Sequence, residues 1–193
     1  MYSHVVLPAD ATKLQSRFQI GDIAMTISNP PESIAIERLQ ADEERRLKRM
    51  RLRALRESPE AFGSTYEDTI RRTHAVWKQQ ASDLPTWIAV LEGEDCGMVR
   101  TAPHADDSAA AFLISMWVAP EARGKGAGDH LVEAVLSWAR AQGLGRVVLD
   151  VGDHNAPAIA LYTRHGFNPT GRTSQLAPPR DHITEHERTC ELA

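Results

Sequence analysis

Residues 116–131 read MWVAPEARGKGAGDHL, in which an apolar strand ends at Pro120 and a glycine-rich turn leads into a helix. The glycines at alternate positions, Gly124, Gly126 and Gly128, let successive backbone N–H groups point to one side with no Cβ in the way. The helix that follows adds unpaired N–H groups and the positive end of its dipole. We therefore expect an anionic group, such as a phosphate, to bind at this turn.

Three kinds of phosphate site use a turn of this type. A P-loop for nucleoside triphosphates is excluded because the residue after its Lys must be Ser or Thr to ligate magnesium, whereas Lys125 is followed by Gly126. A dinucleotide-binding turn fits poorly, since its Gly-x-Gly-x-x-Gly spacing requires glycine at the position of Leu131. Because Asp150 ends the next predicted strand, where a ribose contact is expected, a dinucleotide site stays as a distant alternative.

The third kind of site binds coenzyme A. The pattern Arg123-x-x-Gly126-x-Gly128 resembles the acetyl-CoA signature of the GNAT N-acyltransferase superfamily. Farther along the chain, Asn155, Tyr162 and the pair Gly166-Phe167 resemble the second signature of that family. The structural alternative for the glycines is a plain tight turn, which would not require Arg and Lys among them.

The resemblance covers roughly residues 33 to 170 and implies a bacterial-type, acetyl-CoA-dependent N-acetyltransferase that needs no metal. It also implies that the CoA thioester lies between two splayed parallel strands, here 109–118 and 146–151. The residues that it assigns to CoA are Met116, Trp117, Val118, Arg123, Gly124, Lys125, Gly126, Ala127, Gly128, Asp129, Asn155 and Tyr162.

The resemblance makes Tyr162 the general acid that protonates the departing CoA thiolate. A phenol with a pKa of about 10 is chemically suited to this step. The base that deprotonates the amine is left open among Glu60, Glu67, Asp150 and a water molecule. No cysteine adjoins either signature, so we expect direct attack by the amine in a ternary complex.

Aromatic residues before the first strand of the central hairpin are candidates for the acceptor pocket, although aromatic residues at such spacing are commonly core. They are Phe62, Tyr66 and Trp77. The acceptor itself is expected to be a small-molecule or peptide primary amine. A non-catalytic CoA-binding or regulatory module on the same fold is the competing class, because a fold does not establish an activity.

The chain of 193 residues has 42% hydrophobic and 25% charged residues, which is typical of a globular domain. We expect one α/β domain of GNAT type over 33–193, preceded by an extension over 1–32 of unknown role. Its sheet should be mixed and mostly antiparallel, with a splayed parallel pair at the CoA site and helices on both faces. A single helix is predicted over 66–80, with Ile70 and Trp77 facing inward.

Composition argues against several classes of partner. Cys96 and Cys190 are far apart and outside any Cys-x-x-Cys pair, so free thiols are expected. No histidine cluster has a set of metal ligands, and no apolar run approaches the roughly 20 residues of a membrane span. The net charge of −4 gives no general attraction to nucleic acid, and the arginine-rich helix over 45–56 is interpreted as a solvated face. We expect a cytoplasmic protein, with a homodimer possible.

Overall fold

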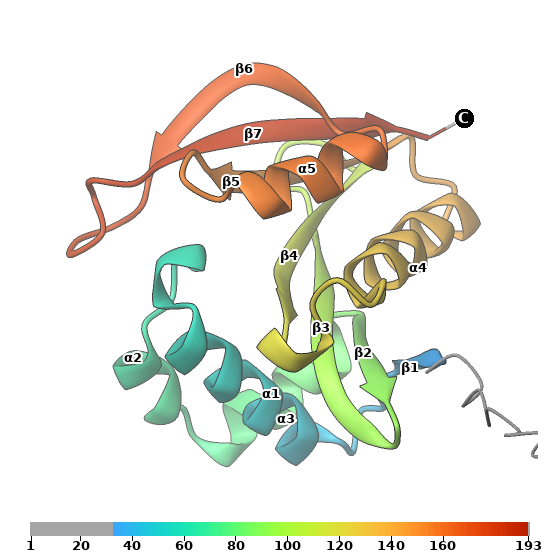
Figure 1. Ribbon diagram of the computed structural model, residues 1–193, viewed down its shortest axis with the longest axis vertical. Coiled ribbons are helices and arrows are strands. Elements are labelled where there is room, and N and C mark those ends of the chain that lie inside the picture. The colour runs from blue at the N-terminus through green and yellow to red at the C-terminus, as the bar shows by residue number, and fades with distance from the viewer. Residues whose placement is uncertain (1–32, 193) are drawn as a thin grey trace, which may run out of the picture. The chain divides into compact units, whose positions relative to one another are not determined.

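The computed structural model describes residues 33–192, so the expected extension over 1–32 lies outside the described part. A seven-stranded sheet with the order β1-β2-β3-β4-β5-β7-β6 organises these residues (Figure 1). Neighbouring strands are antiparallel except β4 and β5, which confirms the mostly antiparallel sheet with one parallel pair. The strands are β1 (Ile34–Arg38), β2 (Thr86–Leu91), β3 (Glu94–Pro103), β4 (Ala110–Val118), β5 (Arg146–Gly152), β6 (Asn168–Gln175) and β7 (Thr184–Glu191).

Helices cover the sheet on two sides. Figure 1 shows α4 on one side of β3 and β4 and the first three α-helices on the other. The helices are α1 (Glu44–Glu57), α2 (Tyr66–Ile70), α3 (His74–Asp83), α4 (Ala127–Ala141) and α5 (Ala156–Arg164), with short 3-10 turns η1 (Pro59–Ala61) and η2 (Pro120–Ala122).

The expectation of one helix over 66–80 is wrong. Helix α2 ends at Ile70. Thr73 then caps the start of a separate helix, α3, by accepting a hydrogen bond from the Val76 N–H at 3.4 Å. Ile70, at the end of α2, is 43% exposed, whereas Trp77 of α3 is buried in the core. A capping threonine inside an apolar pattern is a start signal that outweighs the periodicity.

The hydrophobic core lies between the sheet and the helices. Leu47 and Leu55 of α1 and Leu131 and Val135 of α4 are at most 1% exposed. Each such side chain contributes about 1.5–3 kcal/mol when it leaves water. The amphipathic patterns of α1 and α4 therefore hold both helices against the same strands, β3 and β4.

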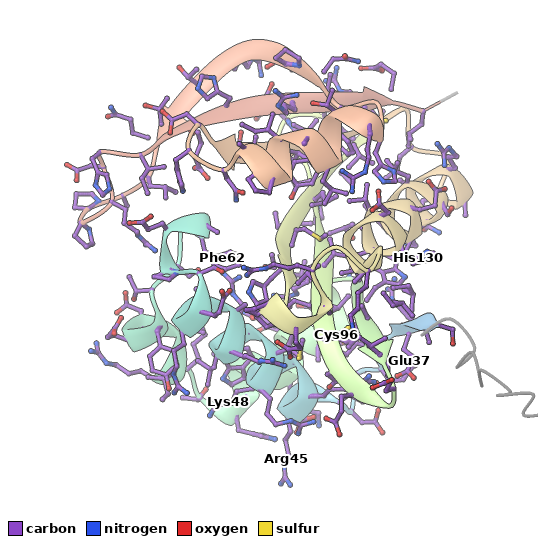
Figure 2. All side chains as sticks on the ribbon, viewed as in Figure 1. Glu37, Arg45, Lys48, Phe62, Cys96 and His130 are labelled. Carbon is purple, nitrogen blue, oxygen red and sulfur yellow. The ribbon has the colours of Figure 1, made fainter. Side chains whose placement is uncertain are left out.

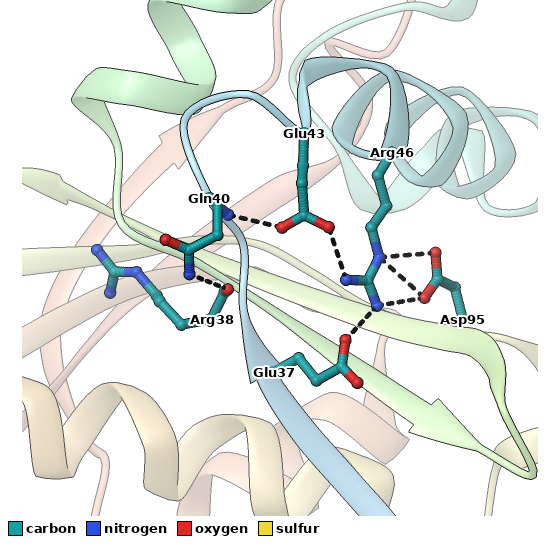
Figure 3. Close-up of polar contacts among 6 residues, drawn as sticks. All are labelled: Glu37, Arg38, Gln40, Glu43, Arg46 and Asp95. Carbon is teal, nitrogen blue, oxygen red and sulfur yellow. Dashed lines mark hydrogen bonds and ion pairs between the residues drawn. The ribbon is translucent and has the colours of Figure 1, made fainter.

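The first half of α1 is also anchored by charge (Figure 3). The guanidinium of Arg46 donates to the carboxylates of Asp95 on β3, Glu43 before α1 and Glu37 on β1, with N–O distances of 2.6, 3.0 and 2.8 Å. Asp95 makes the largest contribution to a pKa of Arg46 that is raised above its usual value. One partly buried cation therefore joins α1 to two strands of the sheet.

We predict that Arg46→Ala lowers the free energy of unfolding by about 2 kcal/mol, because it leaves three carboxylates facing one another without their cation. Urea denaturation measures the change. Arg45→Ala is the matched control, since Arg45 is the preceding residue and points away from the sheet (Figure 2). Equal losses in the two variants would contradict the anchoring role of Arg46.

Candidate functional site

A cleft of about 1310 Å³ opens beside β4. One wall is the end of α1 with the segment 57–64, and the opposite wall is the end of β5 with α5; Figure 1 shows α1 below and β5 with α5 above the gap beside β4. The glycine turn and the start of α4 close one end. The volume exceeds that of a typical small-ligand pocket, about 300–1,000 Å³, so two ligands can share it.

The cleft exists because β4 and β5 separate. The two strands pair only between Ala110–Phe112 and Arg146–Val148. Beyond this point β5 stays paired with β7, and β4 stays paired with β3. The facing edges of β4 and β5 therefore have no strand partner next to the cleft.

A bulge changes the direction of β4 inside the cleft. Met98 of β3 pairs with Trp117 and Arg100 pairs with Ile114, so Ser115 and Met116 together face one residue of β3. Ser115 has a φ of 56°, a left-handed conformation that is uncommon for a residue other than glycine. Such bulges are frequent beside functional sites, where they redirect backbone and side-chain groups.

The glycine turn has the geometry of an anion site. Gly124 and Gly126 have φ angles of 77° and 91°, and Gly126 begins α4 without a side-chain cap. Within residues 33–192, no acceptor is recorded for several backbone N–H groups here, those of Gly124, Gly126, Ala127, Gly128 and Asp129. Gly124, Gly126, Gly128 and Asp129 line the cleft, whereas Lys125 and Ala127 do not. Unpaired N–H groups at a helix start are the donors that a phosphate requires.

Arg123 is held by the protein itself. Its Nε donates to the Val118 carbonyl at 3.1 Å, and its Nη2 donates to Glu57 Oε2 at 2.7 Å. The same Glu57 oxygen accepts the indole N–H of Trp117 at 2.8 Å. Glu57 therefore joins the end of α1 to β4 and to the glycine turn.

Glu57 is a charged acceptor in this junction. Partial burial favours its neutral form, but hydrogen bonds from Ser58, Trp117 and Arg123 outweigh burial and lower its pKa. Sequence reasoning missed Glu57 because its partner Arg123 lies 66 residues away, and no local pattern indicates such a pair.

Asp129 joins the start of α4 to the end of α5. Its carboxylate accepts from Arg164 at 2.6 and 2.7 Å and lies 2.9 Å from His165 Nε2. The hydrogen bonds from Arg164, more than those from His165, lower the pKa of Asp129 to about 2. The α5 side chain of Leu161 also packs against the first turn of α4, since a Cβ at Gly128 would lie only 3.1 Å from Leu161.

The residues of the second signature lie in α5 and line the cleft. Asn155 caps the helix by accepting the Ala158 N–H at 3.3 Å. Tyr162 is 6% exposed and packs edge-on against Phe167, with ring centroids 5.7 Å apart. Burial raises the pKa of Tyr162 well above its usual value. No hydrogen bond of its hydroxyl is recorded among the described residues, so a protonated phenol is available to the cleft.

Two carboxylates line the wall formed by β5 and β7. They belong to Asp150 and Glu185. The pKa values of both are raised, mainly by partial burial and to a smaller extent by a neighbouring negative charge. Glu60 lines the opposite wall, whereas Glu67 on α2 is not among the lining residues. Asp150 is thus the base candidate with both a place in the cleft and a raised pKa.

The three aromatic acceptor candidates are separated by the fold. Phe62 lines the cleft. Trp77 is 1% exposed in the core, and the Tyr66 hydroxyl accepts a hydrogen bond from Arg56, so neither is a lining residue. Arg180 of the β6–β7 loop donates to the carbonyls of Pro59 and Gly63 at 2.8 and 2.9 Å, which holds the segment beside Phe62 in place.

Both cysteines lie away from the cleft. Cys96 and Cys190 are free thiols, 3% and 6% exposed, and burial raises their pKa values. Across the described part of the chain, no group of three His, Cys, Asp or Glu side chains could hold a metal ion. Over the same residues, no helix combines the length and apolar character needed to cross a membrane.

Comparisons with known proteins agree with this geometry. Residues 48–167 match the model of the acetyltransferase (GNAT) family. The mycothiol acetyltransferase of Beutenbergia cavernae is 31% identical over 127 residues, which cover 66% of this chain and 42% of that protein. The L-methionine sulfoximine/L-methionine sulfone acetyltransferase of Pseudomonas aeruginosa is 40% identical over 129 residues, covering 58% of this chain and 75% of that protein.

The fold is also that of solved acetyltransferases. A GNAT-family acetyltransferase from Streptococcus pneumoniae superposes with a TM-score of 0.69 at 22% identity, covering 83% of this chain and all of that one. The chain spans less than half the length of the mycothiol acetyltransferase that it matches.

We predict that Asp129→Asn destabilises the protein at pH 7 because it removes the ion pair between α4 and α5. The folded pKa of Asp129, about 2, lies below the ordinary value of 3.8, so its contribution is complete above pH 4 and is lost as the pH falls toward 2. Urea denaturation of the unchanged protein and of Asp129→Asn at pH 7, 4 and 3 measures this. The difference between their midpoints should become smaller as the pH falls. A difference that stays constant over this range would contradict the ion pair.

Proposed function

Because the chain belongs to the GNAT acetyltransferase family, we propose that it transfers an acetyl group from acetyl-CoA to a primary amine. The observation that carries the proposal is the cleft itself, which joins an uncapped glycine turn, two separated strands and a buried tyrosine. The names of the two relatives indicate different compounds, mycothiol in one case and L-methionine sulfoximine or L-methionine sulfone in the other. The family alone therefore leaves the acceptor open.

The donor binds along the open edge of β4. The unpaired N–H groups at Gly126 to Asp129 hold the pyrophosphate, and Arg164 adds positive charge at the same end. Acetyl-CoA supplies the acetyl group as a thioester. Backbone groups of Met116, Trp117 and Val118 lie where β4 has no β5 partner, and there they orient and polarise the reacting carbonyl.

Tyr162 acts as the general acid. The phenol is protonated at neutral pH, as an ordinary tyrosine is, and its place in the cleft lets the hydroxyl donate to the sulfur that leaves. The low exposure of the ring excludes water from this proton transfer.

The wall formed by β5 and β7 accepts the proton that the amine loses. Asp150, next to Glu185, removes it directly or through one water molecule. A carboxylate with a raised pKa is the stronger base, which supports this role for Asp150.

The acetyl group passes directly between the two substrates in a ternary complex. The other route, through an acyl-cysteine, needs a thiolate in the cleft. Cys96 and Cys190 are buried elsewhere with raised pKa values, which supports direct attack.

We predict that Gly126→Val weakens acetyl-CoA binding about tenfold or more, because a β-branched residue strains a φ of 91° and displaces the N–H groups of the turn. Calorimetry with acetyl-CoA measures the affinity. Gly143→Val is the matched control, since Gly143 has a φ of 70° at the other end of the same helix, outside the cleft. The assignment fails if both variants bind acetyl-CoA as the unchanged protein does.

We predict that Tyr162→Phe lowers kcat about 10²- to 10³-fold while the affinity for acetyl-CoA stays the same. The substitution keeps the ring that packs on Phe167 and removes only the proton donor. Release of free CoA thiol with a panel of primary amines measures the rate. An unchanged kcat would exclude the general-acid role, and acetyl-CoA binding without transfer in the unchanged protein would indicate a binding module.

A further inference from the structure

Arg51 lies on the wall of the cleft that the donor does not use. It comes from α1, lines the cleft and is 7% exposed. Its Nη1 is fully buried without a hydrogen-bond partner, and no ion pair of its guanidinium is recorded among the described residues. Phe62 also lines the cleft, and the centroid of its ring lies 4.3 Å from the guanidinium carbon of Arg51.

The charged groups that act on the pKa of Arg51 are also cations. Burial lowers the pKa of Arg51 most, and the positive charges of Arg100 and then Arg72 lower it further. Together the three causes bring the pKa to about 9. This value still leaves Arg51 protonated at neutral pH. Among the described residues, no carboxylate is found to act on Arg51, and the two other arginines lie behind the lining of the cleft.

The other two arginines have partners that Arg51 lacks. Arg100 donates to the Gln80 carbonyl at 2.9 Å and to Thr86 Oγ1 at 3.2 Å. Arg72 donates to Gln80 Oε1 and lies over the Trp77 ring. The Phe62 ring offers Arg51 a cation–π contact but no lone pair for its N–H groups.

A buried cation without a partner is costly to the fold. Desolvation of an ammonium or guanidinium group costs several kcal/mol unless an anion and hydrogen bonds compensate. An apolar side chain at position 51 would fill the same space on the inner face of α1, next to Leu47 and Leu55, without that cost. An anion that entered the cleft and bound the guanidinium would offset this cost.

We propose that the amine acceptor carries a carboxylate, as a free amino acid does, and that the guanidinium of Arg51 binds this carboxylate beside Phe62. The inference rests on the proposed acetyl transfer for the role of the acceptor. A planar guanidinium matches a carboxylate in shape and charge, and the low exposure of Arg51 makes the pair stronger than one in water. The segment 59–63 that Arg180 holds in place closes the subsite.

The test compares amino acids with their own primary amides and decarboxylated amines, for example L-leucine, L-leucinamide and 3-methylbutylamine. The unchanged protein should acetylate the carboxylate form with a kcat/KM at least tenfold higher than the other two. In Arg51→Met this preference should vanish, while the affinity for acetyl-CoA and the melting temperature stay the same or the melting temperature rises. Arg49→Met, an exposed arginine of the same helix outside the cleft, should keep the preference.

The outcomes separate this inference from the proposed function. Equal acetylation of all three forms overturns the carboxylate subsite and leaves acetyl transfer intact. A preference that survives in Arg51→Met also overturns it. Calorimetric titration of the CoA-bound protein with the amino acids measures binding without turnover. Binding that disappears in Arg51→Met supports the subsite. Absence of binding for every amino acid tested overturns it. Failure to bind acetyl-CoA at all would instead contradict the proposed function.

Discussion

The separation of β4 from β5 after three residue pairs is the constraint on which the site depends. Both strands keep their outer partners, so the gap costs only the hydrogen bonds that would have joined their facing edges. Unpaired strand edges are normally unfavourable because they attract other chains or lose hydrogen bonds to water. Here the exposed edge lies inside a cleft, and the bulge at Ser115 interrupts the regular pairing of β4 with β3 there. A ligand with its own amide groups can complete the pairing, which makes the gap a binding surface.

Two polar junctions keep the walls of the gap in position. Asp129 ties the start of α4 to the end of α5, and Glu57 ties the end of α1 to β4 and Arg123. Both carboxylates have lowered pKa values, so both junctions are ionised at neutral pH. The glycine turn lies between them. A side chain that capped the N–H groups of this turn would occupy the place of the anion. The turn must therefore be fixed by contacts of the neighbouring elements.

The sequence predicted the parts of the site that are local in the chain. The glycine turn and the caps of α5 depend on neighbouring residues, and the parallel pair follows from a strand–helix–strand unit. Contacts between distant segments were not predictable: Glu57 meets Arg123 across 66 residues, and α2 and α3 divide at a threonine cap inside an apolar pattern. Arg51 did leave a local signal, since it lies four residues from Leu47 and four from Leu55 on the apolar face of α1.

The arginines of α1 show that a run of like charges can contain three different environments. Arg45 points into solvent, Arg46 is satisfied by three carboxylates, and Arg51 is buried with none. The first costs the fold nothing and the second stabilises it. The third lowers stability until an anion arrives, and residues of this kind persist at functional sites, where binding recovers the free energy that folding lost. A helix that packs against the sheet with a cation on its inner face therefore contributes specificity for an acceptor as well as stability.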